Sequence, residues 1–184
     1  KILHLRTVKG KGFEPAEKDP TVWHAPGKFD PETGERSKSN SANSPLKYQD
    51  VFGKTLVELA EQNKKIVGVT AAMPSGTSMS MMQKAFPDRT FDVGIAEQNM
   101  ASVAAGLSSY GFVPFISSFT PFATRRICDQ IAISIAYAKQ NVKIIGSDPG
   151  ISAELNGGTH MSMEDIGVLR SIPGLVIFEP VDEG

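Results

Sequence analysis

The sequence has 184 residues, a net charge of −1 and a hydrophobic content of 40%, which is too high for a disordered chain and suits one α/β domain with additional segments. The near-neutral charge provides no basic surface for nucleic acid, and no apolar run is long enough to span a membrane. The single cysteine, Cys128, excludes an internal disulfide and suits a reducing compartment, so we expect a cytoplasmic protein.

The first part of the chain differs in character from the rest. Residues 1–9 alternate in polarity and predict a strand, whereas residues 10–47 are rich in Gly, Pro, Ser and Asn and predict a loop followed by a linker. A loop of this length inside one compact domain is uncommon, so the segment either carries function or joins two domains. The chain begins within a predicted strand and ends just after another, and we therefore expect a fragment of a larger protein.

Beyond Leu46, helical and strand patterns alternate. Apolar residues at helical spacing predict helices over residues 47–63, 78–86, 97–109, 122–138 and 163–170. Short apolar runs predict strands over residues 66–69, 90–93, 112–116, 142–145 and 175–178. This alternation indicates βαβ units, and hence an α/β fold with a parallel sheet and right-handed crossovers.

Glu97 is the most informative single residue of the sequence. It follows the strand predicted at 90–93 and Gly94, and it opens a helix of small residues. Ligands of open α/β sheets bind beyond the carboxyl ends of the parallel strands, so a carboxylate at this position is placed to act on a bound molecule. The alternative is an acidic residue that is favoured at a helix N-terminus by the macrodipole.

Four stretches of the chain, in the right order, resemble one enzyme family. They are Lys9–Pro20 with its continuation through Trp23–Ala25 and Lys28–Pro31, Phe86–Arg89 leading into the Glu97 motif, Arg125–Gln130, and Gly157–His160 with the later Leu169–Gly174. Together they resemble the 1-deoxy-D-xylulose-5-phosphate synthases of the transketolase superfamily. Transketolases share the Lys-Gly-Lys-Gly segment and the later histidine, but not the Pro-Ala-Glu-x-Asp-Pro or Lys-Phe-Asp-Pro segments.

The resemblance implies a fold and a domain organisation. The fold is the three-layer, parallel-sheet thiamine-diphosphate-binding fold of the transketolase pyrimidine-binding domain. Residues 1–36 would be the tail of the diphosphate-binding domain with an active-site loop, residues 37–46 a linker, and residues 47–184 a C-terminally truncated pyrimidine-binding domain. The implied cofactors are thiamine diphosphate and Mg²⁺. The magnesium ligands would lie upstream of residue 1, so no metal ligand is assigned in this chain.

The resemblance also implies cofactor-binding residues. Glu97 would hydrogen-bond the aminopyrimidine ring of the cofactor and start catalysis. Ile95, in the same motif, would lie against the cofactor, and Phe119 and Phe122 would pack against the pyrimidine. For the two phenylalanines the alternative is an ordinary place in the core, because phenylalanine is usually buried.

Substrate residues follow from the same resemblance. Counted back from Asp129, Arg126 matches the substrate-side arginine of the family, but one extra residue after Phe119 makes Arg125 its competitor. Arginine suits a phosphorylated or carboxylate substrate through bidentate hydrogen bonds. His160 and the earlier His24 match the catalytic histidines. Asn156 stands where the family has an aspartate, and its amide carries no charge, which leaves the substrate preference open.

The expected reaction condenses pyruvate, a 2-keto acid, with glyceraldehyde 3-phosphate and releases CO₂, as a step of isoprenoid biosynthesis. The alternative is a transketolase that moves a two-carbon ketol unit between sugar phosphates. An alternative of another class is an inactive cofactor-binding or assembly module, because both partner halves of the enzyme would be missing from this fragment. We expect the complete enzyme to be a homodimer that binds neither nucleic acid nor membrane, and the fragment alone to be inactive.

Overall fold

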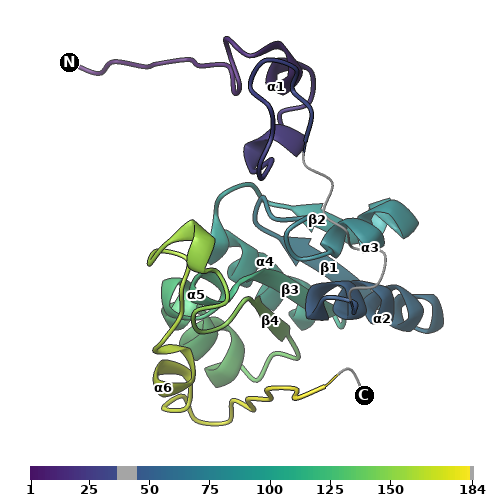
Figure 1. Ribbon diagram of the computed structural model, residues 1–184. Coiled ribbons are helices and arrows are strands. Elements are labelled where there is room, and N and C mark those ends of the chain that lie inside the picture. Colours follow the sequence, from purple (N-terminus) through teal and green to yellow (C-terminus); the bar gives the residue numbers. More distant parts are fainter. Residues whose placement is uncertain (37–44, 183–184) are drawn as a thin grey trace. The chain divides into compact units, whose positions relative to one another are not determined.

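The computed structural model describes residues 1–36 and 45–182. The chain divides into two compact units, residues 1–45 and 46–184, and each unit is described by itself (Figure 1). Residues 37–44, which make up most of the predicted linker, lie outside the described residues. In the part of the chain that is described, no helix combines the length and the hydrophobicity needed to cross a membrane.

The first unit is built around a small aromatic cluster. It contains the helix α1 (Glu14–Lys18) and the 3₁₀ turn η1 (Val22–His24). The Trp23 ring packs edge-on against Phe13 and Phe29, with 4.9 Å between centroids in both pairs. The strand predicted over residues 1–9 is wrong, because residues 1–8 carry no secondary structure and are exposed. Alternating polarity does not supply the neighbouring strand that a strand needs for its hydrogen bonds.

The second unit is an α/β domain with a parallel sheet. Its sheet has the order β2-β1-β3-β4, and every pair of neighbouring strands is parallel. The strands are β1 (Ile66–Thr70), β2 (Thr90–Asp92), β3 (Val113–Phe119) and β4 (Lys143–Ser147). The main helices are α2 (Tyr48–Gln62), α3 (Met79–Ala85) and α4 (Glu97–Ser109). The parallel sheet predicted from the sequence is confirmed.

Helices cover both faces of this sheet and give the domain three layers (Figure 1). On one face, Leu56 of α2 and Met79 and Met82 of α3 form a buried cluster with Ile66. On the other face, Val69 packs with the alanines of α4 and with three isoleucines of the following segment, Ile127, Ile131 and Ile135. Alternate residues of one strand therefore serve two separate cores, as expected for a sheet that is buried on both sides.

The long helix predicted over residues 122–138 is interrupted. The segment contains α5 (Thr120–Ala123), the 3₁₀ turn η3 (Arg125–Ile127) and the π-helix η4 (Gln130–Tyr137). The interruption falls at Thr124, whose backbone angles of φ −124° and ψ −89° are not helical. The isoleucine periodicity survives the interruption, which explains why the sequence pattern resembles one continuous helix.

The chain ends differently from the prediction. The short helix α6 (Asp165–Leu169) lies within the predicted range 163–170. The strand predicted over residues 175–178 is wrong, because this stretch forms no strand and Val176 is 89% exposed. A short apolar run fits a buried strand, but only pairing with a neighbour makes it one.

The Phe-Pro-Asp-Arg segment has a structural role in the second unit. It forms the turn η2 (Pro87–Arg89), from which Arg89 Nη1 donates hydrogen bonds to the carbonyl oxygens of Ala60, Asn63 and Ile66 at 3.0, 3.3 and 3.4 Å. The guanidinium also lies over the Phe86 ring, 4.0 Å from its centroid. Arg89 thereby joins the end of α2 to the beginning of β1.

Candidate functional site

Glu97 occupies the carboxyl end of the parallel sheet. At the end of β2, the Asp92 carboxylate accepts hydrogen bonds from the backbone N–H groups of Ala72 at 2.8 Å and Gly94 at 3.0 Å. Gly94, with φ +74°, makes the turn that leads into α4. Glu97 is the first residue of α4 and is only 5% exposed. A helix N-terminus favours a negative charge, but a carboxylate buried to this degree also needs a partner.

Arg126 is that partner. Its Nη1 donates a hydrogen bond of 2.7 Å to Glu97 Oε1. Its guanidinium carbon lies 3.9 Å from the centroid of the Phe122 ring, a distance typical of a cation–π contact. Gln98 Nε2 donates to the backbone oxygen of Arg126 at 3.2 Å, which ties α4 to η3.

His160 completes a continuous cluster around the Phe122 ring. The imidazole centroid lies 5.2 Å from Phe122 and 5.6 Å from Phe119, edge-on to both rings. Phe119 ends β3 and Phe122 lies in α5, so the ends of two elements converge on the histidine. Five residues predicted from the sequence are therefore joined by contacts in one cluster, which we call the Glu97 cluster: Glu97, Phe119, Phe122, Arg126 and His160.

The loop that carries His160 is fastened at two places. Near its base, Gly150 and Ser162 exchange backbone hydrogen bonds of 2.9 and 3.0 Å. Nearer the histidine, Arg125 Nη1 lies 2.5 Å from Glu164 Oε1, and its Nη2 donates to the Thr159 carbonyl oxygen at 3.4 Å. The hydrogen bond from Arg125 is the main cause that lowers the pKa of the Glu164 carboxyl below its ordinary value.

The two neighbouring arginines thus have different partners. Arg126 contacts Glu97, whereas Arg125 contacts the histidine loop. Sequence reasoning named both arginines but missed Glu164, which is 39 residues from Arg125 along the chain. Nothing in the local sequence around Glu164 signals this pairing, because an acid at the start of a short helix is common.

Two further predicted site residues of the second unit have no described contact with the cluster. The Ile95 side chain is 84% exposed, and Asn156 is exposed at the end of the 3₁₀ turn η5 (Glu154–Asn156). Among the described hydrogen bonds, ion pairs and ring contacts, none joins either side chain to the Glu97 cluster. His24 is exposed and belongs to the first unit.

The sheet's carboxyl end also holds several buried hydroxyl groups. Ser117 and Ser118 of β3 and Ser147 of β4 have buried hydroxyl oxygens without a hydrogen-bond partner in the described part of the chain. Within residues 1–36 and 45–182, no group of three or more His, Cys, Asp or Glu side chains is arranged to hold a metal ion.

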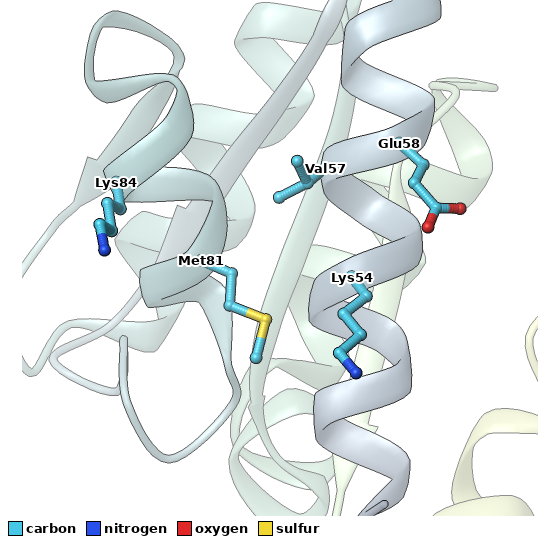
Figure 2. Close-up of a pocket in the computed structure, with 5 residues that line it drawn as sticks. All are labelled: Lys54, Val57, Glu58, Met81 and Lys84. Atoms are coloured by element: carbon cyan, nitrogen blue, oxygen red, sulfur yellow. The ribbon is translucent and has the colours of Figure 1, made fainter.

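A shallow surface pocket lies elsewhere, between α2 and α3 (Figure 2). Figure 2 shows its lining side chains, which come from these two helices: Lys54, Val57, Glu58, Met81 and Lys84. None of them belongs to the Glu97 cluster. The Glu97 cluster is the better candidate site, because it combines a buried carboxylate with aromatic rings at the carboxyl end of a parallel sheet, where ligands of such folds bind.

Comparison with known proteins places the chain in a family. Residues 44–184 match the family model described as "Transketolase, pyrimidine binding domain". The chain is 51% identical to the 1-deoxy-D-xylulose-5-phosphate synthase of Bacteroides fragilis, in a match that covers 100% of this chain and 28% of that protein. It is also 52% identical to the 6-deoxy-6-sulfo-D-fructose transketolase subunit SqwH of a Clostridium species, over 73% of this chain and 42% of that protein.

Solved structures agree with this match. One, described as "Split gene transketolase, inactive beta4 tetramer", is 43% identical, with a TM-score of 0.58 over 68% of this chain and 40% of that one. The Campylobacter jejuni transketolase is 23% identical, with a TM-score of 0.69 over 80% of this chain and 23% of that one, and shares the fold. The chain spans 28% of the length of the Bacteroides fragilis synthase. From residue 44 onward, the chain belongs to the family of transketolase pyrimidine-binding domains.

Proposed function

We propose that this chain is the pyrimidine-binding part of a thiamine-diphosphate-dependent, 1-deoxy-D-xylulose-5-phosphate synthase-like enzyme. The observation that carries the proposal is the Glu97 carboxylate, 5% exposed at the carboxyl end of a parallel sheet and paired with Arg126, whose guanidinium lies over the Phe122 ring. The identity of 51% to a synthase over the whole chain supports it. Residues 1–36 would be the tail of the diphosphate-binding domain, with residues 37–46 as the linker, because the similarity to the synthases extends over them as well.

The side chains present fit an aminopyrimidine. Glu97 offers a carboxylate that can accept a hydrogen bond from a protonated ring nitrogen, and burial strengthens such a bond. Phe122 offers an aromatic face on which a flat heterocycle can stack. The diphosphate and Mg²⁺ would be held by another part of the complete enzyme.

Bound thiamine diphosphate would supply a carbon nucleophile and an electron sink, which protein side chains lack. Glu97 would hold or share a proton at its carboxylate oxygens, facing the ring nitrogen. His160 would act on the substrate as a proton donor or acceptor. The Thr159 Oγ1 lies 2.9 Å from His160 Nδ1, so we assign Nε2 to the substrate. Arg126 would bind the phosphate or carboxylate of the substrate.

The preferred reaction joins pyruvate and glyceraldehyde 3-phosphate with loss of CO₂ in a homodimeric enzyme. A second candidate is ketol transfer between sugar phosphates, which is favoured by the identity of 52% to a transketolase subunit. Asn156 in place of an acid leaves the choice open. The inactive assembly module is a third, because a relative of 43% identity is described as an "inactive beta4 tetramer".

The test uses the full-length protein and the variant Glu97→Gln. We expect the wild type to exchange the C2 proton of bound thiamine diphosphate, as followed by NMR in D₂O, and Glu97→Gln to lose this exchange while its thermal unfolding stays cooperative. The control is Glu61→Gln, which removes an exposed carboxylate from α2. Normal exchange in Glu97→Gln would refute the role of Glu97.

The substrate class is tested separately with the wild type. Release of CO₂ from pyruvate in the presence of glyceraldehyde 3-phosphate supports the synthase. Ketol transfer from a ketose phosphate without pyruvate consumption supports the transketolase. The absence of both activities in the full-length protein supports the assembly module.

A further inference from the structure

The guanidinium of Arg126 makes two contacts at once. It donates a 2.7 Å hydrogen bond to Glu97 Oε1, and its carbon lies over Phe122 within 3.9 Å of the ring centroid. A guanidinium is planar and cationic and presents N–H donors at its edge. These are the properties by which a protonated aminopyrimidine would be recognised by a carboxylate beside an aromatic face.

Burial differs between the two charged partners. The Glu97 side chain is 7% exposed and the Arg126 side chain 40% exposed. An unpaired carboxylate buried to this degree is costly, and the Arg126 guanidinium compensates its charge. Because Arg126 is the more exposed partner, its side chain can leave towards solvent while Glu97 stays in place.

The backbone around Arg126 is held independently of this ion pair. Gln98 Nε2 donates to the Arg126 carbonyl oxygen at 3.2 Å. The side chain of Arg126 can therefore change its rotamer without a shift of η3. Arg125 has a different partner, Glu164, and does not compete for Glu97.

We propose that the Arg126 side chain and the aminopyrimidine ring of the cofactor compete for the same place, so that cofactor and arginine exchange on Glu97 and Phe122. This inference rests on the proposed function. The displaced guanidinium is then available to the substrate, so the exchange couples cofactor binding to completion of the substrate site. Arg126 thereby sets the apparent affinity for the cofactor, because binding has to break its contacts.

The first experiment measures thiamine diphosphate binding to the full-length apoprotein by calorimetry in the presence of Mg²⁺. We expect Arg126→Ala to bind the cofactor about three- to tenfold more tightly than the wild type, the size expected when one charged contact no longer has to be broken. Arg170→Ala, which removes an exposed arginine, is the control and should bind like the wild type. If the wild type binds thiamine diphosphate and Arg126→Ala binds it equally or more weakly, the exchange is rejected while the proposed function stands.

A second experiment needs no cofactor and keeps the inference testable if Arg126→Ala is unstable. Millimolar guanidinium should fill the place vacated by the arginine side chain and raise the unfolding temperature of Arg126→Ala, but not that of the wild type or Arg170→Ala. An equal effect of guanidinium on all three proteins would contradict the proposal that a guanidinium occupies this place beside Glu97 and Phe122. If no protein binds thiamine diphosphate, the proposed function fails and the exchange fails with it.

Discussion

Replacing Arg89 with alanine should destabilise the second unit. One nitrogen of this side chain donates to the carbonyl oxygens of Ala60, Asn63 and Ile66, which belong to the end of α2, the connecting turn and β1. The substitution leaves these three acceptors without the donor. It also removes the contact with the Phe86 ring.

The size of the effect follows from these contacts. Nη1 carries two protons, so its three acceptors amount to about two charge-assisted hydrogen bonds of roughly 1 kcal/mol each at a partly exposed site. The cation–π contact adds about 0.5 kcal/mol. We expect Arg89→Ala to lower the free energy of unfolding by about 2–3 kcal/mol. Arg89→Lys keeps the charge but loses the planar guanidinium, so its free energy of unfolding should lie between those of the wild type and Arg89→Ala.

Urea denaturation followed by circular dichroism measures this loss. The control is Arg170→Ala, because Arg170 is exposed and its removal should change stability by less than about 0.5 kcal/mol. If Arg89→Ala unfolds within about 0.5 kcal/mol of the wild type, the three shared hydrogen bonds do not stabilise the junction of α2 and β1.

Two further predictions concern packing and protonation. A Cβ at Gly53 would lie 2.8 Å from the Ser78 backbone oxygen, so Gly53→Ala should lower the free energy of unfolding by about 1–3 kcal/mol. A Cβ at Gly106 would meet nothing within 4 Å, so Gly106→Ala should raise the free energy of unfolding by about 0.5–1 kcal/mol through the helix α4. Urea denaturation compares the two variants with the wild type. Arg125→Ala should raise the Glu164 pKa towards its ordinary value in an NMR titration. Because the folded-state pKa is lowered, the stabilisation from this contact is present above the ordinary pKa and is lost as the pH falls through the lowered one.

The sequence pattern predicted the bounds of an element correctly where nearby residues begin and end it. The helix α4 begins at Glu97 and ends at Ser109, as predicted, because a glycine turn precedes it and Gly111, with φ +86°, follows it. Patterns that depend on a distant partner were less informative. Residues 1–9 and 175–178 resemble strands in sequence, but neither is paired in the described structure. At Thr124, the isoleucine periodicity concealed a break in the helix.

For the candidate site as well, nearby sequence predicted some features and only the fold reveals the others. Its members came from short motifs that each carry chemistry, and the structure adds their proximity, with Arg126 contacting Glu97 and Phe122. The competition between Arg125 and Arg126 could not be decided by counting, because the extra residue in this segment shifts the register. The contact with Glu164 could not be predicted at all, since it joins residues that only the fold brings together. The roles of these residues remain predictions.

The hydrogen bonds between Gly150 and Ser162 close one loop at its base and separate a fixed part from an outer part. His160 is two residues from this closure, whereas Asn156 and the 96% exposed Leu155 lie farther along the enclosed stretch. Substitutions or changes of length in that outer stretch leave the hydrogen bonds between Gly150 and Ser162 intact, so they do not release the backbone that carries His160. The outer stretch can therefore diverge between related proteins, while the backbone that carries His160 stays fixed.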